Sequence, residues 1–231
     1  MSYIDPTYII LVLIPSLVLS GLAQMFVSSA YQKWGNTRNS KGMTGVDVGR
    51  RITQAVNLGG VRFEGTQGQL TDHYDPSGHI VRMSESVATK PSVAAMAIVA
   101  HELGHAQQYV EKSPFISMRS FLVPAMRFSP IAAYALIFMG LIFGVTGLAW
   151  LGIGFFGIVV LFMLLTLPVE FDASRRGLKL LEEAGLTTGG GQDASGAKQM
   201  LTAAALTYVA AFVSSLLTLL YYVMLVQRSS R

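Results

Sequence analysis

The sequence predicts a mainly α-helical membrane protein with four transmembrane helices and one small α+β domain. Of its 231 residues, 52% are hydrophobic and only 13% are charged, and the mean hydropathy is +0.48. Charged residues are absent from three long stretches, at residues 6–32, 128–169 and 199–227. A helix of about 20 apolar residues crosses a bilayer core that is about 30 Å thick. The outer two stretches are therefore long enough for one span each, and the middle stretch for two.

The first span is expected at residues 6–30, and we interpret it as an uncleaved anchor. The segment "SGLAQ" at 20–24 offers small residues, so a cleaved signal peptide is the alternative. However, residues 1–7 carry no positive charge, only Asp5, whereas a secretory signal begins with a basic segment.

Residues 33–127 are expected to form most of the polar domain. Thr44 is suited to cap a short amphipathic helix. The sequence "DPSG" at 75–78 is a strong turn signal between two β-prone segments, which predicts a β-hairpin. An apolar helix is then expected at 91–112, because Pro91 suits a first helical turn. The segment that follows this helix is expected to approach the membrane along its interface.

The middle and last apolar stretches are expected to hold the other three spans, at 129–148, 150–169 and 202–227. Glycines on both sides of Trp150 favour a turn there, with the tryptophan at the membrane interface. Residues 170–198 are expected to continue as a helix out of the membrane and then to turn. The alternative is that an apolar stretch forms one long helix, or a helix in the core of a soluble protein.

The basic residues predict that both polar segments lie in the cytoplasm and both termini outside the cell. Residues 33–127 contain eleven Lys or Arg and residues 170–198 contain four, whereas only two follow the last span. Positive residues collect on the cytoplasmic side of a membrane. The net charge of +4 is therefore explained by membrane orientation, and nucleic acid is not an expected partner. The absence of cysteine excludes disulfides and thiol nucleophiles.

The predicted helix at 91–112 contains the sequence "HELGH", an H-E-x-x-H motif. His101 and His105 are four residues apart, so one helix face presents both imidazoles to a single metal ion. Glu102 lies beside that face, where it can take a proton from a metal-activated water without being a ligand. The alternative is a chance motif on a solvated helix. The preceding Ala, Ile and Val residues instead predict a buried helix, in which two histidines and a glutamate need partners.

A catalytic zinc normally takes three protein ligands, so a third residue is needed. Glu170 is the first charged residue after the middle apolar stretch, and topology places it at the same membrane face as the metal-binding helix. Its alternative role is simply to flank a membrane span. His73 and His79, on either side of the hairpin turn, are the other candidates for the third ligand.

Four segments resemble the YugP-type membrane zinc metallopeptidases: "AHELGHAQQ", "LPVEFDASRRGLKLL", "LTDHYDP" and "AAALTYVAA". The resemblance covers nearly the whole chain. It implies a zincin-like α+β catalytic domain of the gluzincin type. One Zn²⁺ per chain would be bound by His101, His105 and Glu170, with Glu102 as the catalytic base.

The chain also resembles, more distantly, the HtpX-type and CaaX-processing membrane proteases, in which a second carboxylate follows the ligand glutamate by four residues. Here Ser174 occupies that position and Asp172 lies two residues after Glu170. These two residues are the candidates for orienting a ligand histidine. The candidates for contacting substrate or stabilising the transition state are Tyr74, His73, His79 and Arg175.

These features predict a membrane-embedded zinc endopeptidase that hydrolyses peptide bonds of membrane or membrane-proximal proteins. Its expected partners are polypeptide substrates and the lipid bilayer, and the sequence leaves open a homo-oligomer or a regulatory membrane partner. One rival function is a site-2-type intramembrane protease, which needs an aspartate ligand in a later span, but residues 128–169 and 199–227 contain no acid. The other is a catalytically silent membrane adaptor, for which a broken motif would be the simplest sign. Here the motif is intact.

Overall fold

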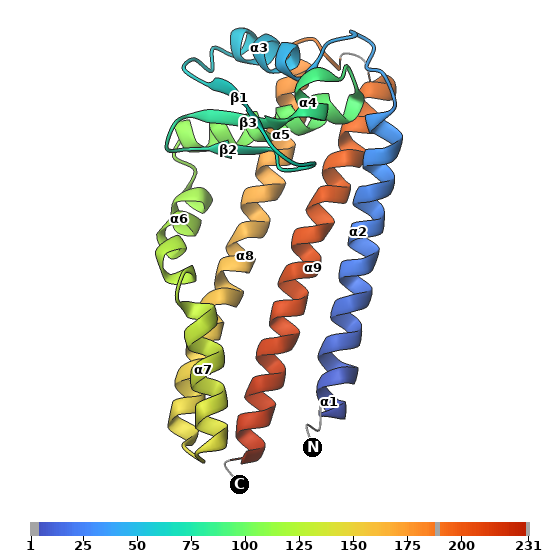
Figure 1. Cartoon of the computed structure of the whole chain (residues 1–231). Coiled ribbons are helices and arrows are strands. Elements are labelled where there is room, and N and C mark those ends of the chain that lie inside the picture. The colour runs from blue at the N-terminus through green and yellow to red at the C-terminus, as the bar shows by residue number, and fades with distance from the viewer. Residues whose placement is uncertain (1–4, 188–189, 230–231) are drawn as a thin grey trace. The chain divides into compact units, whose positions relative to one another are not determined.

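The computed structural model describes residues 5–187 and 190–229 and is mainly α-helical (Figure 1). The chain divides into two compact units. The helical unit takes its described residues from 1–23, 117–168 and 207–231, and the α+β unit from 24–116 and 169–206. The expected turn within 170–198 includes residues 188–189, and the predicted outside location of the termini concerns 1–4 and 230–231. All of these lie outside the described residues.

The described helices number ten, including one π-helical segment, η1. They are α1 (Pro6–Tyr8), η1 (Ile9–Leu13), α2 (Ile14–Gly35), α3 (Gly45–Ala55), α4 (Glu85–Thr89), α5 (Val93–Val110), α6 (Pro114–Met126), α7 (Ser129–Ile142), α8 (Thr146–Glu183) and α9 (Gly191–Ser229). By length and composition, three helical segments could cross a membrane: 6–35, 146–183 and 191–229. The pair α6 and α7 passes the same test together but bends by 51°, as a broken span or a re-entrant segment would. The sequence predicts four spans. The described residues contain three candidate spans, or four if the bent pair α6 and α7 counts as one span.

The boundary between α7 and α8 differs from the one expected from the sequence. The turn before α8 lies at 143–145, where Gly144 has a φ of 69°, a conformation that glycine adopts at no steric cost. Trp150 is therefore inside α8 rather than at the turn. The expected spans at 129–148 and 150–169 correspond to α7 and to the first part of α8, and the helical continuation expected after residue 169 is present as far as Glu183.

The last helix begins eleven residues before the expected residue 202, at Gly191. Its first turn is fixed by Asp193, because this buried carboxylate accepts hydrogen bonds from the backbone N–H of Ser40 at 2.9 Å and from its hydroxyl at 2.6 Å. The partner lies about 150 residues away in the sequence, which is why local turn signals predicted a loop here.

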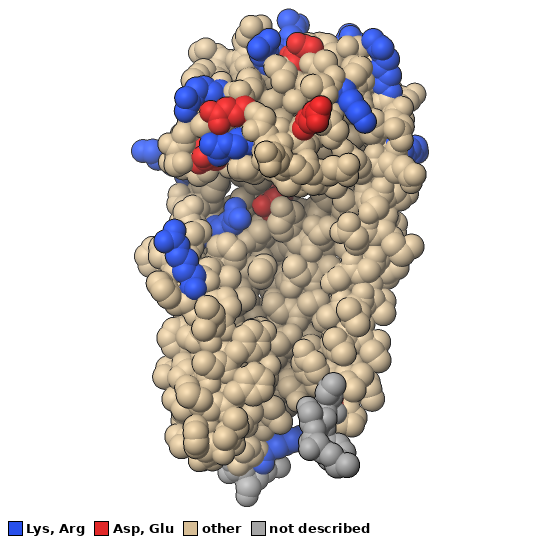
Figure 2. Space-filling model, viewed as in Figure 1, with Lys and Arg blue, Asp and Glu red and all other residues tan. Residues whose placement is uncertain are grey.

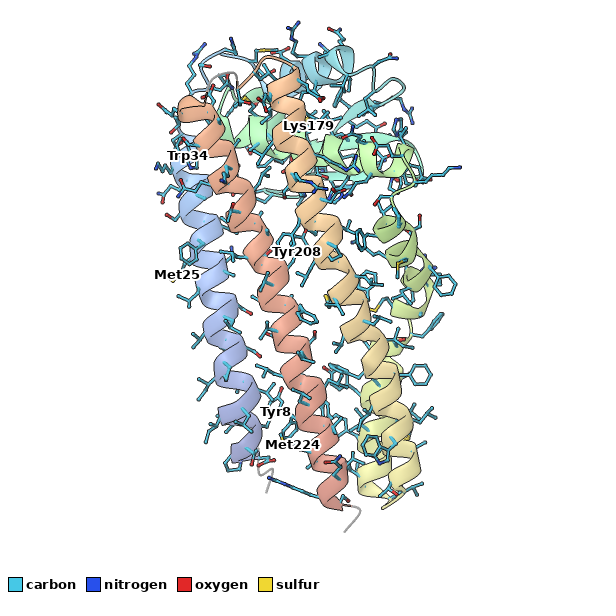
Figure 3. All side chains as sticks on the ribbon, turned by 180° about the vertical axis from the view of Figure 1, so that it is seen from behind. Tyr8, Met25, Trp34, Lys179, Tyr208 and Met224 are labelled. Carbon is cyan, nitrogen blue, oxygen red and sulfur yellow. The ribbon has the colours of Figure 1, made fainter. Side chains whose placement is uncertain are left out.

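The helical unit has two clusters of buried apolar residues. The helices α7 and α8 touch through their backbones, because a Cβ on Gly140 would lie 2.4 Å from the backbone nitrogen of Ala149. The first and last helices of the unit also contact each other. Tyr221 of α9 donates a hydrogen bond to Asp5 at 2.9 Å, and its ring lies 5.0 Å from that of Tyr8 in α1. Figure 3 shows Tyr8 close to the end of α9 that carries Met224.

The α+β unit contains one sheet of three short strands, β1 (Arg62–Thr66), β2 (His73–Asp75) and β3 (Ile80–Ser84), in the order β1-β3-β2. The antiparallel pairing of β2 with β3 confirms the predicted hairpin. In its turn, hydrogen bonds from Ser77 and from the Arg82 guanidinium hold the pKa of Asp75 well below its usual range. The parallel pairing of β1 with β3 was not expected from the sequence. The strand β2 lies at an edge of the sheet.

The helix α5 is the buried centre of the α+β unit, because residues 92–100 are all buried. It begins at Val93, two residues later than the expected residue 91. Ser92 is its N-cap and accepts a hydrogen bond from Ala95 N, so Pro91 precedes the helix instead of lying in its first turn. The predicted cap at Thr44 is confirmed, since Thr44 and Asp47 form a reciprocal capping box at the start of α3.

The charged side chains gather on the surface of the α+β unit. Figure 2 shows Lys, Arg, Asp and Glu interspersed over its sheet and short helices, whereas the visible face over α7 carries only uncharged residues. This separation agrees with the charge-free stretches of the sequence. It is the pattern expected for a chain whose apolar helices meet lipid and whose polar unit meets water.

Candidate metal centre

Three potential metal ligands converge within the α+β unit. The helix α5 supplies His101 and His105, and α8 supplies Glu170. The Nε2 atoms of the two histidines lie 3.3 Å and 3.5 Å from the same oxygen, Oε2 of Glu170. All the ligand atoms lie within 4.8 Å of one another. Ligand atoms around a tetrahedral zinc ion, with bonds of about 2.0–2.1 Å, are about 3.3 Å apart. The spacing therefore fits one zinc ion.

The carboxylate of Glu170 has a polar atom that the protein alone does not satisfy. Glu170 is 3% exposed, and its Oε2 makes no hydrogen bond of acceptable geometry among the described residues, although Nε2 of His101 and Nε2 of His105 lie 3.3 Å and 3.5 Å away. A buried carboxylate oxygen without a partner is strongly unfavourable. A divalent cation held between this oxygen and the two imidazoles would remove that cost, so the residues present fit a metal ion.

Two glycines allow α5 and α8 to cross closely enough to form this group. A Cβ on Gly104 would lie 2.3 Å from the carbonyl oxygen of Ala173, and one on Gly177 would lie 2.9 Å from the carbonyl group of Ala100. Contacts that short do not occur, so a methyl group at either position would force the helices apart. Gly104 and Gly177 therefore bring Glu170 within reach of the histidines.

Each of the two candidate ligand histidines has a second contact through its other ring nitrogen. His101 Nδ1 lies 3.2 Å from the hydroxyl oxygen of Ser174, and His105 Nδ1 lies 3.1 Å from Oε1 of Gln108. Among the described residues, the polar partners of the Asp172 carboxylate are Gln108, Arg175 and Arg176 rather than a histidine. The hydrogen bond that this carboxylate accepts from Gln108 is 2.8 Å long. Gln108 was missed from the sequence, although its position three residues after His105 on one helix face was an available signal.

Glu102 lies next to the ligands in α5 and faces the sheet. It is 8% exposed, and its Oε2 accepts a hydrogen bond of 2.9 Å from the backbone N–H of Tyr74. Tyr74 belongs to the edge strand β2, so this strand lies alongside the H-E-x-x-H helix. The hydrogen bond holds the carboxylate of Glu102 in one orientation.

The other candidate residues have partners away from the three ligands. The Tyr74 hydroxyl lies 2.7 Å from Nδ1 of His79, and burial raises the pKa of Tyr74 to about 12, so this phenol keeps its proton at neutral pH. The exposed His73 contacts a backbone carbonyl at 2.8 Å. Arg175 is exposed and pairs with Asp172. Neither His73 nor His79 belongs to the group of converging ligand atoms.

The pKa of His105 differs from its ordinary value. Burial alone would lower its pKa, but the carboxylates of Glu170 and Glu102 and the amide of Gln108 favour the charged imidazolium more strongly, so the pKa is raised. A metal ion has to displace the proton from Nε2 in order to bind there. Metal binding therefore weakens as the pH falls.

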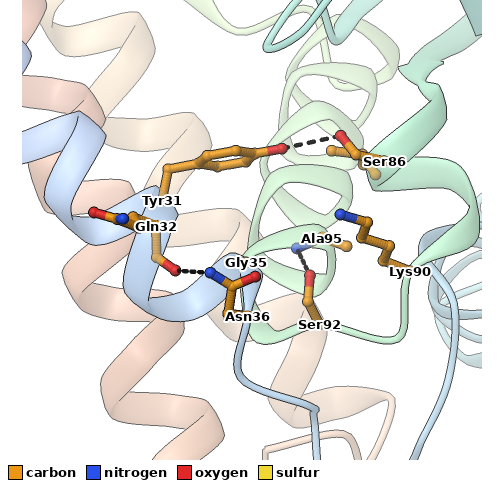
Figure 4. A pocket seen from close by; sticks show the side chains of 9 residues that line it. Tyr31, Gln32, Gly35, Asn36, Ser86, Lys90, Ser92 and Ala95 are labelled. Atoms are coloured by element: carbon orange, nitrogen blue, oxygen red, sulfur yellow. Dashed lines mark hydrogen bonds between the residues drawn. The ribbon is translucent and has the colours of Figure 1, made fainter.

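A separate pocket lies elsewhere in the α+β unit (Figure 4). It has a volume of about 220 Å³ and lies between the last turn of α2, the helix α4 and the start of α5. A hydrogen bond of 2.9 Å joins the hydroxyls of Tyr31 and Ser86 on its wall. None of the three converging ligands lines it, so this pocket is distinct from the candidate metal centre.

Comparisons with known proteins agree with the chemistry of this centre. Residues 8–227 match the model of a family described as "Putative neutral zinc metallopeptidase". The chain is also 39% identical over 212 residues to "Putative membrane protease YugP" of Bacillus subtilis (strain 168), an alignment that covers 92% of this chain and 93% of that protein. No solved structure matches the chain. The protein therefore belongs to this family of zinc metallopeptidases and is a homologue of a membrane protease.

Proposed function

We propose that the protein is a zinc-dependent endopeptidase of the gluzincin type, in which His101, His105 and Glu170 hold one Zn²⁺ and Glu102 is the general base. The observation that carries the proposal is the convergence of two histidine nitrogens, Nε2 of His101 and Nε2 of His105, on the buried Oε2 of Glu170. Glu102 is adjacent to this group in α5 but is not a member of it, as a base requires. Membership of the family supports both the metal and the reaction.

The residues of the centre have separate roles in the proposed reaction. Bound zinc supplies a Lewis acid that polarises the substrate carbonyl and acidifies water. Glu102 takes the proton from the attacking water and returns it to the amine that leaves. The N–H of Tyr74 keeps the Glu102 carboxylate oriented for both transfers. The Tyr74 phenol stays protonated and is a candidate hydrogen-bond donor to the developing oxyanion.

The edge strand β2 supports an extended polypeptide as the substrate. Its backbone N–H at Tyr74 donates to Glu102, so the edge of β2 that pairs with no further strand of the described sheet faces the proposed base. A peptide added as a further strand at this edge would present a backbone carbonyl to the centre. The apolar helices support substrates that are membrane or membrane-proximal proteins.

The proposed activity is tested with the full-length protein in lipid nanodiscs and an unfolded polypeptide, such as carboxymethylated casein, that is either free or tethered to lipid. We expect internal cleavage of both, faster for the tethered form. Cleavage should stop on removal of metal by a chelator and return with one equivalent of zinc per chain, because the Lewis acid is required. Cleavage that continues after complete metal removal would contradict the zinc mechanism. No cleavage of either substrate at full zinc occupancy would favour the silent adaptor.

We also propose that the α+β unit faces the cytoplasm and both termini face outward, which the distribution of basic residues supports. The chain has no cysteine, so single cysteines can report on its orientation. Lys41→Cys lies in the exposed part of the α+β unit, and Val145→Cys in the exposed turn before α8. A membrane-impermeant maleimide is expected to label Val145→Cys in intact cells and Lys41→Cys only after permeabilisation. The opposite pattern would reverse the orientation.

A further inference from the structure

We propose that Gln108 is a positioning residue that fixes one tautomer of His105 and links this ligand to Asp172. Gln108 is completely buried, yet each polar atom of its side chain has a partner. The inference deepens the proposed function, because it rests on His105 being a zinc ligand. It concerns the state of His105 before and after the metal binds.

The hydrogen bonds of Gln108 leave one orientation for its amide group. Nε2 donates to the carbonyl oxygen of Val169 and to Oδ2 of Asp172, both at 2.8 Å. A backbone carbonyl and a carboxylate can only accept, so the atom that faces both must be the nitrogen, with its two hydrogens. The flipped amide would place an oxygen against two oxygens. The carbonyl oxygen of Gln108 therefore faces His105.

This orientation determines where His105 carries its proton. Oε1 of Gln108 can only accept, and it lies 3.1 Å from Nδ1 of His105, so Nδ1 must be the donor. A neutral imidazole has a single N–H, which leaves a lone pair on Nε2. Nε2 is the atom that lies 3.5 Å from Oε2 of Glu170, in the ligand group. In water the neutral imidazole favours the other tautomer, so Gln108 sets the one that a metal requires.

Asp172 anchors this arrangement from the side opposite His105. Its carboxylate accepts a hydrogen bond of 2.6 Å from Nε of Arg176 and also pairs with Arg175. Arg176 is held in turn by Glu111 at 2.6 Å. In many metal sites a carboxylate contacts the metal-binding histidine directly. Here the carboxylate of Asp172 acts on His105 through the side-chain amide of Gln108. His101 differs, because the Ser174 hydroxyl can either donate or accept and so fixes no tautomer.

The first test replaces Gln108 by Leu, which keeps most of the volume, with Gln107→Leu as the matched control one residue earlier in α5. The tautomer of His105 is read by ¹⁵N-histidine NMR of the metal-free, full-length protein at alkaline pH, with His105→Ala for assignment. We expect Nδ1–H in the wild type and in Gln107→Leu, and Nε2–H in Gln108→Leu. Zinc affinity, measured by chelator competition, should fall about 10–100-fold in Gln108→Leu and stay unchanged in the control.

The second test separates the proposed relay from a general packing defect. Gln108→Glu alone sets two carboxylates against each other and should bind zinc more weakly than the wild type. Adding Asp172→Asn gives one oxygen of the introduced carboxylate an amide donor, although that oxygen still faces the carbonyl oxygen of Val169, and leaves the other oxygen free to accept from His105 Nδ1–H. The double variant is therefore expected to regain the Nδ1–H tautomer and part of the lost zinc affinity.

The outcomes distinguish this inference from the proposed function. Retention of the Nδ1–H tautomer and of full zinc affinity in Gln108→Leu would overturn the role of Gln108, while zinc binding by the wild type would leave the metal centre standing. A wild type that binds no zinc would instead overturn the proposed function. The tautomer of the metal-free protein would then still show whether Gln108 sets the proton position.

Discussion

Glu102→Gln is expected to lower the rate of peptide cleavage by about 10²–10⁴-fold, the usual contribution of a general base, while leaving bound zinc unchanged. The amide has the size of the carboxylate but cannot take a proton at neutral pH. Its oxygen can still accept the hydrogen bond from Tyr74 N, so the local structure should persist. The rate is measured on the unfolded polypeptide in nanodiscs, with zinc per chain determined on the same sample.

The matched control for this variant is Glu182→Gln, an exposed acid on α8 in the same unit. It should cleave at the wild-type rate, because it has no place in the metal centre. A Glu102→Gln rate within about tenfold of the wild type would exclude Glu102 as the base, since a base contributes at least about 10²-fold. Loss of zinc from Glu102→Gln would instead show that this carboxylate helps to hold the metal.

Glu170→Ala is expected to lose zinc, and cleavage with it. A catalytic zinc site normally has three protein ligands, and this variant leaves only the two imidazoles. Its affinity loss should exceed the roughly 10–100-fold that follows removal of a residue hydrogen-bonded to a ligand. Chelator competition measures the loss, and Glu170→Gln separates it from a cavity effect, because the amide keeps the volume and lacks the charge.

Glu183→Ala is the matched control for the loss of a negative charge from α8. Glu183 is exposed and forms a surface ion pair with Lys179 at 3.3 Å, an interaction of small energetic value. It should bind zinc as the wild type does. If Glu170→Ala also keeps wild-type affinity, then Glu170 only flanks the apolar part of α8, and the third ligand has to be sought again among His73 and His79.

Several features of the fold and of the candidate centre could be predicted because their signals are local. His101 and His105 are placed on one face by the geometry of a single helix. The hairpin follows from the turn chemistry of "DPSG" at 75–78, and the helix start at Thr44 follows from its side-chain cap. Glu170 was predicted as the third ligand from topology, as the first charge after a long apolar stretch, and from the family resemblance.

Other features could not be predicted because they depend on what meets in space. Four glycines near Trp150 looked alike in the sequence, yet Gly144 makes the turn, while Gly152 lies inside α8, where a Cβ would be 2.7 Å from the backbone of Ile137. Likewise, Gly104 occupies one of the two variable positions of the H-E-x-x-H motif, so the sequence gives no sign of its packing. Its function, contact with Ala173, is visible only when α5 and α8 are both in place.

The central claim, that His101, His105 and Glu170 form one zinc site, is tested most directly by elemental analysis of zinc in the purified full-length protein. The account predicts one zinc per chain in the wild type and in Glu102→Gln, and a fraction of that in His101→Ala and Glu170→Ala. Absence of zinc from a folded wild type supplied with zinc would contradict the claim. So would one zinc per chain that survives both ligand substitutions.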